Sequence, residues 1–108
     1  MTKELGKIKS AEFGHGGYDG AMIGITFGLG GNGWGTSDHW GFWNTERSDY
    51  CKWTEQDRKI YMGDVCMRVS QLLKEAKVTN VSQLVGIPIE VIFNGNSLSS
   101  WRILTEVL

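Results

Sequence analysis

The sequence predicts an α+β fold in which a single antiparallel β-sheet, built in the order β-β-β-α-β-β, carries one long helix on one face. Residues 54–77 have apolar side chains at three- and four-residue steps, which is the period of an amphipathic helix. Segments that alternate between apolar and polar residues predict strands before and after that helix. The chain has 108 residues, enough for one core, and is expected to form a single domain over residues 1–108.

Two strands are expected at the start of the chain. Residues 7–13 alternate only weakly, which is typical of a strand near a sheet edge. The glycines of residues 14–20 predict a loop, because this stretch can adopt positive φ angles at several places. Residues 21–27 predict a second strand, whose Gly24 leaves room for a bulky group over the sheet.

A third strand is expected to complete this part of the sheet. The glycine-rich residues 28–33 predict a turn, and residues 34–43 then run back beside the second strand. Alternate side chains of this third strand are expected to share a face: Trp34, Thr36, Asp38, Trp40 and Phe42. The polar residues 44–52 have no period and predict the connection into the helix.

The helix is expected to cover residues 54–77. Thr54 can accept a backbone N–H of the first turn, and Glu55 and Asp57 suit the positive end of the helix dipole. The apolar stripe predicted to lie on the sheet consists of Met62, Val65, Cys66, Val69, Leu72, Leu73 and Ala76. The other side of the helix is expected to carry Asp57, Tyr61, Asp64, Arg68, Gln71 and Glu75.

The end of the chain predicts a short turn and then a hairpin. Residues 81–86 end in glycine and predict a single turn. Residues 89–93 and 98–104 alternate as strands do. Asn94-Gly95 between them is the favoured residue pair for a two-residue hairpin turn, so two further antiparallel strands are expected.

Charge and cysteine content narrow the classes of function. The chain has 11 Lys+Arg and 12 Asp+Glu, a formal net charge of −1, so no global field attracts nucleic acid and a nucleic-acid partner is disfavoured. Cys51 and Cys66 have no metal-ligand spacing, which favours free thiols in a reducing cytosol. No apolar run has the length of a signal peptide or a membrane span, and no membrane association is expected.

Two patterns that could indicate cofactor binding or catalysis have a simpler structural explanation. Gly28-x-Gly30-x-x-Gly33 matches the dinucleotide-binding pattern, but that pattern must open a helix, and here a strand is expected to follow. The side chains that a metal or acid–base site would need are not at ligand spacing: His15, Asp19, Asp38, His39 and Cys51. Because no nucleophile signature is present either, the sequence predicts a protein that is not an enzyme and holds no metal or cofactor.

Aromatic residues are the strongest candidates for a binding surface. Half of the Trp, Tyr and Phe residues fall between positions 34 and 53. For Trp34, Trp40 and Phe42 the sequence leaves open whether they fill the core or lie on the surface. Exposed aromatic rings are typical of surfaces that bind a protein or a flat ligand. The predicted partner-binding residues are Tyr18, Trp40, Trp43, Tyr50 and Trp53. The predicted ligand loop consists of Gly14, His15, Gly16, Gly17 and Asp19.

Short segments spread over most of the chain carry a resemblance to known proteins. They are SAEFG at residues 10–14 with Gly16-Gly17-Tyr18, AMIG at 21–24, WTEQDR at 53–58, and the ending from LVG at 84–86 to SWRIL at 100–104. These segments resemble a family of small proteins encoded by phages and prophages. The resemblance implies a setting, the cytoplasm of the phage host, rather than a mechanism. By association, a small phage protein without a catalytic signature is often one that binds and disables a host defence component.

Three functions agree with these features. The first is a non-enzymatic phage-type binding protein that inhibits a host protein of an anti-phage defence, such as CRISPR, through the aromatic and glycine-rich surface. The second is an oligomeric small-molecule or nucleotide-binding protein, a sponge for a defence signal, whose glycine loops hold phosphate. The third is a single-stranded nucleic-acid binder that stacks bases on the third strand. The edge strand at residues 7–13 could also pair with a second copy and form a homodimer.

Overall fold

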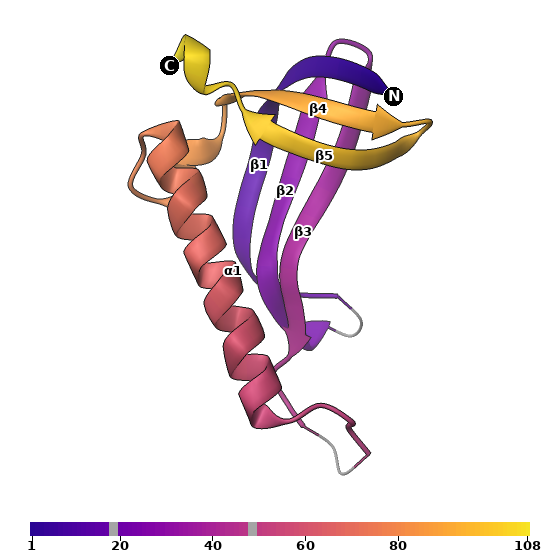
Figure 1. Cartoon of the computed structure of the whole chain (residues 1–108), viewed down its shortest axis with the longest axis vertical. Coiled ribbons are helices and arrows are strands. Elements are labelled where there is room, and N and C mark those ends of the chain that lie inside the picture. The colour runs from indigo at the N-terminus through magenta and orange to yellow at the C-terminus, as the bar shows by residue number, and fades with distance from the viewer. Residues whose placement is uncertain (18–19, 48–49) are drawn as a thin grey trace.

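The computed structural model describes residues 1–17, 20–47 and 50–108, and it confirms the predicted α+β fold (Figure 1). Within these residues one antiparallel sheet has the strand order β3-β2-β1-β4-β5, with β1 (Thr2–Gly16), β2 (Met22–Gly31), β3 (Trp34–Asn44), β4 (Pro88–Asn94) and β5 (Ser97–Ile103). Helix α1 (Glu55–Ala76) joins β3 to the short 3₁₀ helix η2 (Val81–Leu84), and a second 3₁₀ helix, η3 (Thr105–Val107), follows β5. No helix of the described part of the chain is long and apolar enough to cross a membrane.

The sheet curls into a roll. Its central strand, β1, pairs with β4 over its first residues and with β2 over the rest, so it belongs to both halves of the sheet. Residues 2–7 of β1 pair with β4, and residues 6–16 pair with β2. Lys9 is the extra residue of a β-bulge between Ile8 and Ser10, and a bulge bends its strand and shifts the alternation of side chains. The bulge therefore explains the weak alternation of this strand, and it lets β4 and β5 cross the ends of the other strands at a steep angle (Figure 1).

The hydrophobic core lies inside the roll. Its fully buried side chains come from the sheet and from η2: Ile8, Ile25, Phe27, Leu84, Ile89, Val91 and Ile103. Helix α1 contributes Val65, Leu72 and Ala76. In the middle of the core, Phe27 of β2 lies edge-on to Trp40 of β3 and to Trp101 of β5, with ring centroids 4.7 and 5.1 Å away. One phenylalanine thus connects the two edge strands of the sheet.

Helix α1 begins and ends close to the predicted residues. The backbone N–H of Asp57 donates to Thr54 Oγ1 at 3.1 Å, and the backbone N–H of Thr54 donates to Asp57 Oδ2 at 2.8 Å, which makes a capping box. Hydrogen bonding of the Asp57 carboxyl to the backbone N–H of Thr54, and to its side chain, lowers the pKa of that carboxyl below its usual range. At the other end Lys77 adopts the left-handed conformation that commonly ends a helix.

The orientation of α1 about its own axis differs from the prediction. Tyr61 and Arg68, expected on the side away from the sheet, face β3, whereas Cys66, expected in the buried stripe, is exposed. The hydroxyl of Tyr61 donates to the carbonyl oxygen of Gly41 at 3.2 Å, and the Arg68 guanidinium lies 4.0 Å above the Trp40 ring. These contacts with an aromatic edge strand outweigh the burial of a small thiol, because rings and a guanidinium cover more apolar area than one sulfur atom.

Two glycine-rich segments predicted as a loop and a turn are partly strand. Gly14 and Gly16 continue β1, and residues 28–31 continue β2, so the tight turn between β2 and β3 contains only Asn32 and Gly33. Strand β2 lies between β1 and β3, and the hydrogen bonds of both ladders outweigh the low strand propensity of glycine.

The hairpin at the end of the chain is confirmed, but its turn is shifted by one residue. Asn94 pairs with Ser97, so the two turn residues are Gly95 and Asn96 rather than Asn94 and Gly95. Gly95 has a positive φ of 64°, which suits the first central position of a type II′ turn.

The contact between η3 and β5 predicts a dependence of stability on pH. Two N–H groups of Arg102 donate to the two carboxylate oxygens of Glu106 at 2.9 and 3.0 Å, and these bonds lower the pKa of Glu106 from 4.5 to about 2. Because the folded pKa is the lower one, this stabilisation is present above about pH 4.5 and is lost as the pH falls toward about 2. We expect Glu106→Gln to flatten the loss of stability over this window, measured as urea midpoints. Identical pH profiles for the two proteins would contradict the assignment.

Candidate functional site

One face of the long strands β1, β2 and β3 points away from α1, and we call it the outer face (Figure 1). A row of three side chains crosses it, because Glu12 pairs with Thr26 and Thr26 pairs with His39. The hydroxyl of Thr26 lies 3.2 Å from His39 Nδ1, within hydrogen-bond distance. A carboxylate, a hydroxyl and an imidazole thus lie side by side on three neighbouring strands.

The rows on both sides of this polar row carry almost no side chains. One consists of Gly14, Gly24 and Gly41, and the other of Ser10, Gly28 and Ser37. Glycine inside a strand often marks a place where a ligand or another backbone comes close. The outer face therefore presents a polar row flanked by glycines and serines.

Phe42 borders the polar row because a β-bulge turns it to the outer face. It is the extra residue between the pairs Ile23↔Trp43 and Gly24↔Gly41, and its φ is 61°. This position corrects the prediction that Phe42 shares a face with Trp40, since the bulge reverses the alternation.

Glycines make the space that the Phe42 ring occupies. A Cβ atom at Gly24 would lie 2.5 Å from the Phe42 backbone nitrogen and 2.7 Å from its ring, and one at Gly16 would lie 2.7 Å from the ring. Phe42 is therefore the bulky group for which Gly24 was predicted to leave room. The ring also contacts His39 edge-on, with centroids 5.2 Å apart.

A pocket of about 230 Å³ opens on the outer face at this point. Its lining includes the polar row, the Phe42 ring and glycines of β1 and β2: Glu12, Gly14, Gly24, Thr26, His39 and Phe42. Gly14 differs from Gly16 and Gly24, because a Cβ atom there would meet nothing within 4 Å. The pocket can accept and donate hydrogen bonds and can hold a flat group against an aromatic ring.

The predicted ligand loop contributes to this pocket. Gly14, His15, Gly16 and Gly17 all line it, although the first three belong to β1 rather than to a loop. Tyr18 and Asp19 lie outside the described residues. Sequence reasoning did not select Glu12, Thr26 or Phe42, because only the strand register and the bulge bring them together.

Trp40, predicted to bind a partner, lies in the core with 7% of its surface exposed. Its ring stacks on Trp101 at a centroid distance of 5.8 Å. The indole N–H groups of Trp40 and Trp101 both donate to Asp38 Oδ2, at 3.1 and 2.7 Å, and the backbone N–H of His39 donates to Asp38 Oδ1 at 2.9 Å. Asp38 therefore connects β3 to β5 across the opening of the roll. Trp34, by contrast, is half-buried against the edge of the core, where it packs edge-on against Phe93.

Trp43 and Trp53, also predicted to bind a partner, pack against the start of α1. The Trp43 ring lies 5.5 Å from Trp53 and 4.8 Å from Tyr61, measured between centroids. Trp53 is held between Arg47 and Arg58, whose guanidinium carbons lie 5.6 and 5.3 Å from its ring. Both tryptophans are half-buried, and this cluster fixes the connection that leads into the helix.

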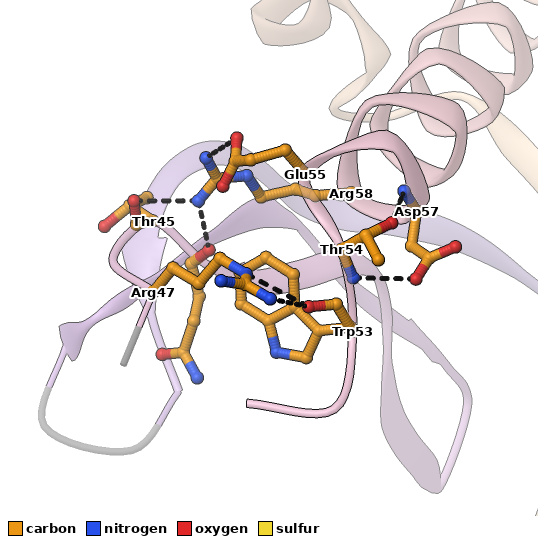
Figure 2. A network of polar contacts seen from close by, with 8 residues as sticks. Thr45, Arg47, Trp53, Thr54, Glu55, Asp57 and Arg58 are labelled. Carbon is orange, nitrogen blue, oxygen red and sulfur yellow. Dashed lines mark hydrogen bonds and ion pairs between the residues drawn. The ribbon is translucent and has the colours of Figure 1, made fainter. Parts of the chain in front are cut away.

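Figure 2 shows the hydrogen bonds that accompany this cluster. The Arg47 guanidinium donates to the carbonyl oxygen of Trp53 at 2.8 and 3.1 Å, and Arg58 donates to the carbonyl oxygen of Thr45 at 2.9 Å. Tyr50, the remaining described residue of the predicted set, is 94% exposed. Among the described aromatic residues of that set, Tyr50 alone presents its whole ring to solvent.

Metal ligands do not gather in the described part of the chain, where no three His, Cys, Asp or Glu side chains come together. The groups that line the outer-face pocket include those of the polar row, Phe42 and the glycine backbone. A comparison of the chain with protein-family models, with curated proteins and with solved structures found no match, so its function is argued from this geometry.

Proposed function

We propose that this chain is a non-enzymatic binding protein that attaches to a protein of the phage host through its outer face and blocks a defence function there. The observation that carries the proposal is the open backbone at Gly14, beside the polar row Glu12, Thr26 and His39. The phage setting rests on the resemblance of the sequence segments described above.

The glycines of the outer face separate into two groups. Gly16 and Gly24 make space for Phe42, and a Cβ atom at Gly28 would lie 2.4 Å from the Ser10 hydroxyl, so packing within the chain accounts for all three. Gly14, like Gly35 near the other end of the sheet, has no such neighbour and no positive φ, but of the two it is Gly14 that lines the pocket. A glycine in a strand without a packing or conformational reason fits a partner that approaches the backbone.

The Thr26–His39 pair is better explained by binding than by catalysis. Hydrogen-bonded side chains on paired strands are ordinary contacts that stabilise a sheet. A nucleophile needs a base that is itself oriented by a third group, and the hydrogen bonds of the described residues place none on the His39 ring besides Thr26. The same two side chains can donate to and accept from a partner.

The proposal is tested by blocking the pocket without disturbing the fold. Gly14→Val puts a β-branched side chain into open space, and we expect a melting temperature equal to or above that of the wild type. If the outer face binds a host protein, a stoichiometric partner captured by the wild-type protein from host lysate is lost with Gly14→Val.

The matched control is Gly35→Val on the same face of β3. A Cβ atom there would meet only the carbonyl oxygen of Leu29, at an ordinary 3.8 Å, and Gly35 pairs with Gly30, away from the pocket. Gly35→Val should retain the partner. Retention by both variants, or loss by both, would refute the assignment of the surface.

A small-molecule or nucleotide ligand is the second candidate, and the shape of the pocket favours it. About 230 Å³ beside the Phe42 ring is room for one planar ring rather than a large ligand. A nucleotide that raises the melting temperature of the wild type but not of Gly14→Val would support this candidate. The third candidate, binding of single-stranded nucleic acid, needed an exposed stacking platform on β3, and the burial of Trp40 removes its central ring.

A further inference from the structure

Arg68 differs from the other arginines of the chain. Arg47, Arg58 and Arg102 donate hydrogen bonds to carbonyl or carboxylate oxygens of the protein. Within the described residues Arg68 makes no hydrogen bond or ion pair, and its contact is the stack on Trp40, with the guanidinium carbon 4.0 Å from the ring centroid. Its N–H donors are therefore not used by the described part of the chain.

The stack holds the Arg68 guanidinium in place. Trp40 is itself fixed, because its indole N–H donates to Asp38 and its ring lies between Phe27 and Trp101. A guanidinium held this close to such a ring has lost part of its freedom before any ligand binds, and Arg68 is still exposed to solvent. Preorganised donors of this kind bind carboxylate or phosphate with two parallel hydrogen bonds.

Two cavities flank Arg68, and their charges differ. The one beside α1, about 230 Å³, is lined by Gln71, Glu75 and Arg102 among others, and Arg102 is already neutralised by Glu90 and Glu106. The carboxylate of Glu75 makes this side unfavourable for an anion.

The second cavity, about 250 Å³, lies between the edge strands β3 and β5, and its carboxylate is that of Asp38. Asp38, His39, Ser99 and Ser100 are among the residues that line it together with Arg68. Ser99 is the extra residue of a β-bulge, since Phe93 pairs with Leu98 and Ile92 with Ser100, and bulges commonly re-aim side chains on an edge strand.

The carboxylate in this second cavity does not compete for Arg68. Asp38 already accepts the indole N–H groups of Trp40 and Trp101 and the backbone N–H of His39. Three donors stabilise its charge, so the donors of Arg68 are left for a ligand.

We propose that Arg68 forms a binding site for a single oxyanion group, a carboxylate or a phosphate, in the cavity that Ser99 and Ser100 help to line between β3 and β5. The site is separate from the outer-face pocket, although His39 lines both cavities at the edge of β3. It does not depend on the identity of the partner proposed above. One cation suits one anionic group and not a polyanion.

The test follows the indole N–H signals of ¹⁵N-labelled protein during titration with inorganic phosphate and, separately, with acetate, at constant pH and ionic strength. We expect saturable shifts of the Trp40 and Trp101 signals, which lie beside the site, and no shift of Trp53, which lies at the other end of α1. Saturation with phosphate alone assigns the site to phosphate groups, and saturation with acetate assigns it to carboxylates.

Two substitutions on α1 with the same change of charge complete the test. Arg68→Gln should weaken the binding at least about tenfold, because the charge and the paired donors are lost together. Lys74→Gln removes one positive charge from an exposed position outside both cavities and should bind as the wild type does. Arg68→Lys retains the charge without the planar edge and should fall between them, which keeps the test valid if Arg68→Gln is unstable. Shifts that do not saturate, or that persist in Arg68→Gln, would overturn the proposal.

Discussion

Phe27→Ala is expected to lower the free energy of unfolding by about 3–5 kcal/mol, a large part of the roughly 5–15 kcal/mol available to a small domain. Phe27 is fully buried and lies edge-on to Trp40 and Trp101, so its removal leaves a cavity at the point where β2, β3 and β5 meet. Urea denaturation followed by circular dichroism measures the loss.

Phe13→Ala is the matched control, because it removes the same ring from the adjacent strand. Phe13 of β1 pairs with Ile25 of β2, and its side chain is 58% exposed. We expect its removal to lower the free energy of unfolding by about 0.5 kcal/mol or less. Equal losses for the two substitutions would contradict the placement of the core between the two halves of the rolled sheet.

Asp38→Ala is expected to cost about 2–4 kcal/mol, because it leaves two indole N–H groups and one backbone N–H without their acceptor. The loss of stability reflects weaker closure of the roll, because the Asp38 carboxylate on β3 accepts the indole N–H of Trp101 on β5. The free energy of unfolding and the tryptophan fluorescence of the folded state should both change.

Asp38→Asn separates the loss of the hydrogen bonds from the loss of the charge. The amide oxygen can take the place of Oδ2 and accept both indole N–H groups, whereas its NH₂ group cannot accept from His39. We therefore expect a smaller loss than with alanine. A variant with asparagine that is less stable than the alanine variant would contradict this account.

The prediction from the sequence succeeded where a local pattern decides the structure. The period of residues 54–77 predicted α1, and Thr54 forms the predicted cap. The prediction failed where pairing with a neighbouring strand decides the secondary structure. The glycines at 28–31 form strand because β1 and β3 pair with them on both sides. A single residue has no local signal for a partner that lies far away in the sequence.

The candidate site was only partly predictable for the same reason. The glycines from Gly14 to Gly17 were identified as a ligand segment, and they line the pocket. Their companions Thr26, His39 and Phe42 depend on the register of three strands and on one bulge, which no spacing in the sequence reveals. The tryptophans chosen as exposed anchors instead pack against each other, against α1 and in the core.

The sequence by itself determined the number and order of the strands and the place of the long helix, because each has its own period, cap or turn residues. The tertiary structure decided which side of each element faces the core. The bulges at Lys9 and Phe42 reverse the alternation of two strands, and the rings of β3 draw Tyr61 and Arg68 of α1 toward the sheet in place of Cys66. These choices set the outer-face pocket and the Arg68 site, because they depend on contacts between residues that are distant in the chain.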